Sequence, residues 1–266
     1  MPDTATKPAP SATVILADPD GGGDEPFAIY LLERAAASRF MPGRFVFPGG
    51  RVEPADGVDP LDRDTLARTA IRELFEEAGV LLAQGRPAAP QRLAEVRRSL
   101  QRGLTTLDLA LDTLKLRADL GALKPVARWI TPAARPRRFD TTFFLAAMPP
   151  GQEATSDQQE TSAGLWLTPS AALAQNQAGQ VALAPPVVRI LGQLSDYPSL
   201  QALFDAKPDL TPVEPVLWAQ DGERVILLPD DPDHAHGRPR SPGRPAPANR
   251  ATRLVHRDGV WLPYQA

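Results

Sequence analysis

Apolar residues follow two different periods along this chain. Short apolar runs bounded by turn residues predict strands, and they occur at 11–18, 27–32, 45–47, 126–131, 141–148, 165–167 and 225–228. Apolar positions that recur every three or four residues predict helices at 63–78, within 91–120, at 169–175, at 186–194 and at 199–206. The chain therefore combines strands with helices, and no internal repeat stands out.

The helix predicted over 63–78 has an apolar face and an acidic face. The apolar face is made by Ala67, Ala70, Ile71, Leu74 and Ala78. Beside that stripe, Glu73, Glu76 and Glu77 fall within an arc of about 100°. Three like charges on one arc cost free energy unless a positive charge lies among them. Because a hard divalent cation prefers oxygen ligands, the pattern predicts a metal site at this helix edge.

Residues 91–120 form a second amphipathic region. Leu107, Leu111 and Leu114 recur at i, i+4 and i+7, which is the spacing of one helix face. We interpret the region as a helical insert that covers the core. A surface that joins two copies of the chain in a homodimer or scaffold is the alternative, and the sequence leaves it open.

The chain divides into three expected parts. A flexible Pro-rich N-terminus spans 1–10, a main domain spans 11–206 with the insert at 91–120, and a C-terminal extension packed on that domain spans 207–266. Within the extension we expect, in order, a strand at 225–228, a long irregular loop at 229–249 and a hairpin that turns at Arg257-Asp258-Gly259.

Composition removes several classes of function. The chain has 266 residues, a net charge of −3 and no cysteine, which argues against a general nucleic-acid binder and excludes disulfides, thiolate metal sites and a cysteine nucleophile. Its three histidines, His234, His236 and His256, lie far along the chain from the acidic helix. No apolar run is long enough for a membrane span and no secretory signal or peroxisomal tripeptide is present, so we expect a cytoplasmic protein.

The acidic helix belongs to a longer motif. Residues 72–80 read Arg-Glu-Leu-Phe-Glu-Glu-Ala-Gly-Val, downstream of the Gly49-Gly50 pair. Together they resemble the Nudix box, G-x5-E-x7-R-E-U-x-E-E-x-G-U with U aliphatic, and the second half matches at every specified position. The first half departs: Asp56 stands where the box has Glu, and Arg72 follows Gly50 by 22 positions instead of 14, an insertion of eight residues. We expect Asp56 to be structural or a cap, not a metal ligand.

Further segments narrow the resemblance to one Nudix branch, which includes the peroxisomal-type coenzyme A diphosphatases. The matching features are 31–34, 40–50, 129–132, 137–144, Glu160, Trp166, Pro169 and the Pro185-Pro186 pair. The similarity covers roughly residues 10 to 205. It implies an α/β (α+β) Nudix fold, a mixed β-sheet sandwiched between helices, here with a helical insertion and a C-terminal extension.

The resemblance also implies an activity. A Nudix pyrophosphohydrolase uses Mg²⁺ or Mn²⁺ to cleave a nucleoside diphosphate derivative. This branch points to coenzyme A or acyl-coenzyme A, split to 3′,5′-ADP and a 4′-phosphopantetheine. Two alternatives stay open: a pyrophosphatase for ADP-ribose or a sugar nucleotide, and a non-catalytic Nudix domain that senses a nucleotide. In each case the expected partner is a small-molecule nucleotide, not a nucleic acid or a membrane.

Carried onto this sequence, the family pattern implies roles for the box residues. Glu73 and Glu77 are the expected principal metal ligands, with a backbone carbonyl of Gly49 or Gly50 as a further oxygen. Glu76 is expected to be a ligand or the general base. Arg72 is expected to pair with a box carboxylate and fix its rotamer.

A second candidate for the base lies outside the box. Glu160 precedes Trp166 by six residues, as in the related branch. The competing interpretation makes Glu160 a surface carboxylate beside Asp157. Both interpretations stay open from the sequence.

Substrate phosphates require cations, and planar guanidinium groups suit phosphate oxygens. The candidates for substrate binding are Arg34, Arg44, Arg137, Arg138 and Phe139. Coenzyme A carries a 3′-phosphate besides its diphosphate, so an arginine cluster fits it; the alternative, that these arginines form a solvated basic loop, stays open. Phe139 is placed to stack on adenine, although an aromatic residue beside a strand is more often part of a core.

Overall fold

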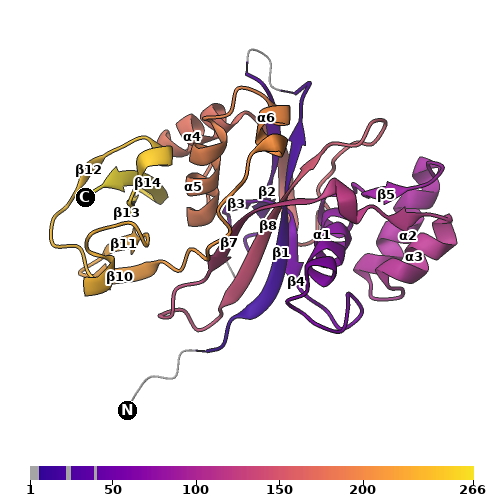
Figure 1. Ribbon diagram of the computed structural model, residues 1–266, viewed down its shortest axis with the longest axis horizontal. Coiled ribbons are helices and arrows are strands. Elements are labelled where there is room, and N and C mark those ends of the chain that lie inside the picture. Colours follow the sequence, from indigo (N-terminus) through magenta and orange to yellow (C-terminus); the bar gives the residue numbers. More distant parts are fainter. Residues whose placement is uncertain (1–5, 22–24, 39–40) are drawn as a thin grey trace.

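A mixed seven-stranded sheet forms the centre of the computed structural model, which describes residues 6–21, 25–38 and 41–266 (Figure 1). Its main path runs β3-β2-β1-β8-β7, with β4 paired to β1 and β9 paired to β2. The strands are β1 (Ala9–Asp18), β2 (Ala28–Arg34), β3 (Phe45–Val46), β4 (Gly49–Arg51), β7 (Lys124–Ile130), β8 (Phe139–Ala147) and β9 (Thr161–Leu167). The β1–β8 pair is parallel and the other pairs are antiparallel, which makes the sheet mixed.

Helices cover both faces of this sheet, as Figure 1 shows. Side chains alternate along a strand, so Ile15 of β1 enters one core and Val14 enters the other. The Ile15 side is covered by α4 (Pro169–Gln177), α5 (Pro185–Leu194) and α6 (Leu200–Asp205), and the Val14 side by α1 (Arg63–Ala78). This arrangement confirms the expected sheet between helices, and it explains why β1 and β2 are apolar on both faces.

Helix α1 has the bounds predicted from its pattern. Asp62 caps its N-terminus by accepting hydrogen bonds from the backbone N–H groups of Asp64 and Thr65. Gly79 ends it at φ 73°, and its N–H donates to the carbonyl of Phe75. A left-handed residue is needed there, which accounts for the glycine that closes the box.

The insert also packs as expected. It contains β5 (Ala83–Gln84), α2 (Pro90–Gln101), α3 (Leu107–Leu114), β6 (Arg117–Ala118) and the 3₁₀ turn η1 (Leu120–Ala122). Leu107, Leu111 and Leu114 are buried in the core that α1 covers. The insert therefore enlarges the hydrophobic core between the main sheet and α1.

The C-terminal region forms a second sheet, in the order β10-β11-β13-β14-β12. Its elements are β10 (Val216–Gln220), β11 (Glu223–Leu227), η2 (His234–His236), β12 (Arg244–Pro245), η3 (Ala248–Arg250), β13 (Arg253–Arg257) and β14 (Val260–Gln265). β13 and β14 form the predicted hairpin. Leu254 and Trp261 join the core beside α5, and Asn176 of α4 donates a 2.8 Å hydrogen bond to the carbonyl of Trp261.

One expectation for this region holds in part. Residues 229–249 are mostly turns and bends, as expected of a long irregular loop, but they also contain η2, β12 and part of η3. Asp231 and Asp233 also pair with Arg253, whose side chain is fully buried. Ion pairs with a residue distant in the sequence thus hold segment 229–249 in place, although its composition is typical of a loop.

None of the helices within the described residues combines the length and apolar character needed to cross a lipid bilayer.

Candidate active site

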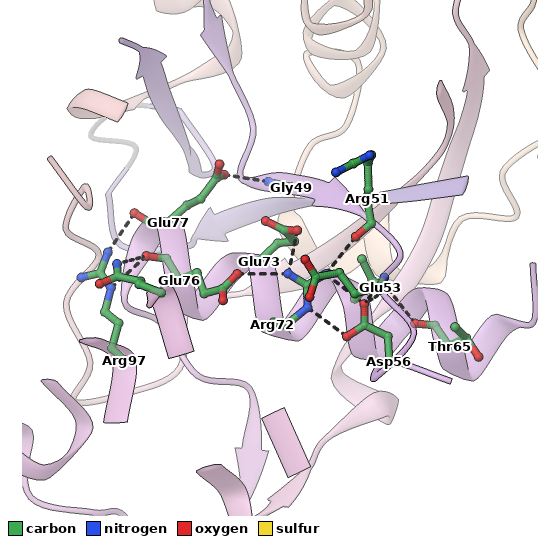
Figure 2. A network of polar contacts seen from close by, with 12 residues as sticks. Gly49, Arg51, Glu53, Asp56, Thr65, Arg72, Glu73, Glu76, Glu77 and Arg97 are labelled. Carbon is green, nitrogen blue, oxygen red and sulfur yellow. Dashed lines mark hydrogen bonds and ion pairs between the residues drawn. The ribbon is translucent and has the colours of Figure 1, made fainter. Parts of the chain in front are cut away.

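The glycine pair of β4 lies directly against the acidic edge of α1 (Figure 2). The backbone N–H of Gly49 donates a 2.9 Å hydrogen bond to Oε2 of Glu77. A Cβ atom added to Gly50 would lie 2.2 Å from Oε1 of Glu73. The Glu73 side chain could turn away from that atom, but a Cβ atom added to Gly49 would lie 2.5 Å from the backbone carbonyl oxygen of Ala12, so glycine is required at position 49.

Arg72 organises the remaining carboxylates. Its guanidinium donates to both oxygens of Asp56 at 2.9 Å, to Glu73 at 2.8 Å and to Glu76 at 3.0 Å. It also donates at 2.8 Å to the carbonyl of Arg51, so all five N–H donors are used. Burial disfavours the charge, but the hydrogen bond and the surrounding carboxylates raise the pKa of Arg72 above its usual value. The expected pairing with a box carboxylate is present, and it includes two of them.

Asp56 has the structural role expected of it. It is 2% exposed, and besides Arg72 it accepts hydrogen bonds from the hydroxyl of Thr69 and the N–H of Glu53, both at 2.9 Å. These contacts tie the long box loop to α1. The carboxylate therefore holds Arg72 in place on the side away from Glu73.

The buried box carboxylates lack sufficient positive charge. Burial, opposed by Arg72 and aided by Glu76, raises the pKa of Glu73 to about 7. Burial and then the charge of Glu73 raise the pKa of Glu77 well above its usual range. Hard oxygen donors in such a setting suit a divalent cation, because the cation would offset both the desolvation and the mutual repulsion.

The carboxylates are held by protein groups in this structure. Within residues 6–21, 25–38 and 41–266, no three Asp, Glu or His side chains converge in a metal-binding arrangement. Glu73 and Glu76 point to Arg72, and Glu77 points to Gly49. The donor set fits a divalent ion by its chemistry, and ion binding would require these side chains to turn.

The helical insert supports the end of the box helix, which the sequence did not predict. Arg97 of α2 donates to the carbonyls of Glu76 at 3.0 Å and Glu77 at 2.9 Å, and Gln101 donates to the carbonyl of Glu76 at 2.7 Å. The last carbonyls of a helix need such partners, and a cation there also suits the helix dipole. Their need for donors was the available signal, but it did not identify which residue would provide them.

Two predicted residues outside the box lie near it. Arg34 ends β2, and its charge lowers the pKa of Glu77. Glu160 is exposed, its carbonyl accepts a 2.9 Å hydrogen bond from the N–H of Ala35, and its charge raises the pKa of both Glu73 and Glu77. Both residues therefore act electrostatically on the box carboxylates.

The arginines that precede β8 follow the alternative of a solvated basic loop, with Arg135 and Arg137 exposed. Arg138 is 8% exposed, and it donates to the carbonyls of Thr131 and Thr6 and pairs with Glu214. Arg137 is exposed on the loop before β8, and Phe139 is half-buried at the start of β8, which β1 separates from β4. Arg138 is a structural contact, and no contact links Arg137 to the box among the described residues.

Arg44 points elsewhere. Its guanidinium donates to the carbonyl of Gly259 and lies 3.3 Å from Nε2 of His256, on the C-terminal sheet. The sequence predicted a substrate role for Arg44 and gave no sign of these partners.

A hollow of about 340 Å³ lies at the opposite end of α1. Leu61, Leu66 and Phe144 are among the residues that line it, and it contains none of the predicted site residues. The candidate site is therefore assigned from the carboxylates and the glycine turn.

Known proteins resemble the chain along most of its length. The family model of the NUDT19 Nudix domain matches residues 58–194, and that of the NUDIX domain matches residues 7–105. The acyl-coenzyme A diphosphatase NUDT19 of Gallus gallus is 31% identical, over 78% of this chain and 74% of that protein. Its Homo sapiens counterpart is 27% identical, over 86% of this chain and 76% of that protein.

A solved structure supports the same fold. The crystal structure of a NUDIX hydrolase from Alicyclobacillus acidocaldarius is 29% identical, with a TM-score of 0.66. The similarity covers 76% of this chain and 98% of that one.

Proposed function

This chain belongs to the Nudix hydrolase family, in the branch of the NUDT19 Nudix domain, and we propose that it hydrolyses the diphosphate of coenzyme A or an acyl-coenzyme A. Water attacks one phosphorus, a new P–O bond forms and the anhydride P–O bond breaks. The proton of the water passes to a carboxylate, and the leaving phosphate departs as an anion. The products are 3′,5′-ADP and 4′-phosphopantetheine or its acyl thioester.

The single observation that carries this substrate assignment is the likeness to acyl-coenzyme A diphosphatases, which extends over about three quarters of their length. The geometry supports the reaction class, because buried carboxylates lie against a glycine turn beside Arg72. Other nucleoside diphosphates share the diphosphate but lack the 3′-phosphate and the pantetheine arm, so a comparison of substrates is decisive.

Each box residue has a proposed part. Glu73 and Glu77, with a carbonyl of the Gly49-Gly50 turn, would hold Mg²⁺ or Mn²⁺. The ion, when bound, polarises the diphosphate and acidifies water. Arg72 fixes the rotamers of Glu73 and Glu76 through its hydrogen bonds. Glu76 is the proposed proton acceptor.

Glu160 is the competing proton acceptor. It is exposed beside the box, and its charge reaches Glu73 and Glu77. Replacing each of Glu76 and Glu160 with Gln, and comparing kcat with Mg²⁺ and with Mn²⁺, separates them. The residue that accepts the proton should show the larger loss, on the order of 10² or more.

A substrate panel tests the function. The full chain is incubated with coenzyme A, an acyl-coenzyme A, ADP-ribose and a sugar nucleotide, each with Mg²⁺ or Mn²⁺, and products are identified by mass spectrometry. We expect 3′,5′-ADP from the coenzyme A compounds, at the highest kcat/KM of the panel. Equal or greater turnover of ADP-ribose would overturn the coenzyme A assignment.

A further inference from the structure

Arg97 of α2 joins three segments of the chain at the end of the box helix, where Figure 2 shows it beside Glu76 and Glu77. Its Nε donates to the carbonyl of Glu76 at 3.0 Å, and its Nη2 donates to the carbonyls of Glu77 and Thr155, both at 2.9 Å. Its Nη1 donates to the hydroxyl of Thr155 at 3.1 Å. One guanidinium therefore connects the helical insert, α1 and the segment between β8 and β9.

These contacts depend on the shape of the guanidinium more than on its charge. Among the described residues, no carboxylate lies at ion-pair distance from Arg97, and its acceptors are backbone carbonyls and one hydroxyl. Burial lowers the pKa of Arg97, and the charge of Asp157 opposes that shift. A lysine has all its donors on one nitrogen, so it cannot reach acceptors spread in this way.

Gly79 leaves room for the guanidinium. A Cβ atom added to Gly79 would lie 2.7 Å from Nη1 of Arg97 and 3.3 Å from the hydroxyl oxygen of Thr155. A side chain at this position would therefore displace the guanidinium from its place between α1 and Thr155. The glycine that closes the box thus ends α1 and also admits the side chain that ties α1 to its neighbours.

The segment between β8 and β9 is fastened along the end of α1. The N–H of Thr155 donates to the carbonyl of Ala78 at 2.8 Å. The side-chain amide of Gln152 accepts from the N–H of Leu81 at 2.8 Å and donates to its carbonyl at 2.9 Å. Arg97 adds the contacts that join this segment to the carbonyls of the two box glutamates.

The turn that carries Glu160 begins directly after Thr155, and we call residues 156–160 the acidic turn. Asp157 accepts hydrogen bonds from the backbone N–H groups of Glu160 at 3.2 Å and Thr161 at 2.9 Å, which close the turn. At its far end, the carbonyl of Glu160 accepts from the N–H of Ala35 at 2.9 Å. The place of the acidic turn beside the box therefore depends on where Thr155 is held.

We infer that Arg97 is a positioning residue for the reaction, because it fixes the acidic edge of α1 relative to the acidic turn. The inference rests on the proposed hydrolysis of a diphosphate. Glu73 and Glu77 are the proposed ligands of a divalent ion, and the charge of Glu160 reaches both of them. Groups that orient metal ligands from outside affect metal affinity and turnover. The helical insert is then a support of the active site as well as a cover for the core.

Kinetics of Arg97 variants tests the inference. Arg97→Lys keeps the charge but loses the forked donors, and Arg97→Gln loses both. We expect kcat for coenzyme A at saturating Mn²⁺ to fall about 10- to 100-fold in both variants. KM for coenzyme A should change little, because Arg97 acts on protein groups and not on the substrate. The matched control is Arg98→Gln, at the next and exposed position of α2, which should keep full kcat.

Thermal unfolding shows whether each variant is folded at the assay temperature. Thr155→Val is a milder variant at an exposed position, because it removes only the hydroxyl acceptor of Nη1, and it should lower kcat by a smaller factor. Full kcat in the folded Arg97 variants would overturn the inference, and if they do not fold, full kcat in Thr155→Val would do so. Recovery in Arg97→Lys alone would also overturn it, because the effect would then come from positive charge at a helix end.

Two measurements without substrate separate this inference from the proposed function. In the metal-free full chain, amide hydrogen exchange across 155–161 should become faster in Arg97→Lys but not in Arg98→Gln, because the fastened segment is released. Calorimetric titration with Mn²⁺ alone should show an affinity lowered about 10- to 100-fold in Arg97→Lys.

Both changes together support the inference even if the parent chain does not hydrolyse coenzyme A, in which case only the proposed substrate fails. An unchanged Mn²⁺ affinity in Arg97→Lys overturns the inference whether or not coenzyme A is hydrolysed, because Arg97 would then be a structural contact alone. Exchange that stays as slow as in the parent chain also overturns it, and so does a parent chain that binds no Mn²⁺.

Discussion

Two buried arginines in this molecule sit in opposite electrostatic settings. Arg253 of the C-terminal sheet is fully buried and pairs with Asp231 and Asp233, and Asp233 also pairs with Arg240. Two arginines thus meet two carboxylates, and hydrogen bonds from Arg240 lower the pKa of Asp233 to about 2.

Arg72 of the box is nearly as buried, with 6% of its side chain exposed. It bonds the carboxylates of Asp56, Glu73 and Glu76, while Glu77 bonds the N–H of Gly49 instead. Here the pKa of Glu73 is raised to about 7 by burial. A balanced buried network is typical of structure, whereas excess buried negative charge indicates a site for a positive ligand.

The largest expected effect breaks the balanced network. Arg253→Leu leaves Asp231 and Asp233 buried without their main partner, so we expect the free energy of unfolding to fall by about 3–5 kcal/mol. Urea unfolding measures it, with exposed Arg257→Leu as the control. A loss below about 1 kcal/mol would show that the network does not stabilise the fold.

The next test asks whether the buried charge of the box serves activity and not stability. Glu77→Gln keeps an acceptor for the Gly49 N–H but removes the charge, so we expect kcat to fall on the order of 10² or more. Stability should not fall, because a buried charge is removed. Glu95→Gln, on the exposed face of α2, is the control for activity. Comparable losses in both variants would contradict a special role for Glu77.

Adding a metal ion tests directly whether the box carboxylates bind a divalent cation. An ion that binds only the folded chain raises the free energy of unfolding by roughly 1–3 kcal/mol at about ten to a hundred times its Kd. We expect Mn²⁺ to raise the melting temperature of the parent chain but not that of Glu77→Gln. An equal shift in both would place the ion elsewhere, and a crystal soaked in Mn²⁺ would locate it.

The smallest expected effect is the pH dependence of the balanced network. The pKa of Asp233 is about 2, below its ordinary value of 3.8, so its contribution to stability is present above pH 3.8 and is lost as the pH falls through about 2. Arg240→Gln removes the main cause of the lowered pKa. Acid unfolding followed by tryptophan fluorescence should then move to higher pH, with exposed Arg238→Gln as the control.

Local sequence patterns were sufficient to predict much of the secondary structure. The bounds of α1, its acidic arc and its closing glycine follow from side-chain period and capping, which depend only on residues a few positions apart. The apolar runs likewise predicted the main strands. A sheet between helices then follows from the need to bury those faces.

What tertiary structure alone decided are the partners of the charged groups. Asp56 and Arg97 are both remote in sequence from the residues they hold, and Arg44 contacts His256 from far along the chain. The same applies to Arg253, which pins a segment that composition assigned to an irregular loop. A charge has no period along the sequence, and whether it is satisfied depends on which surfaces the fold brings together.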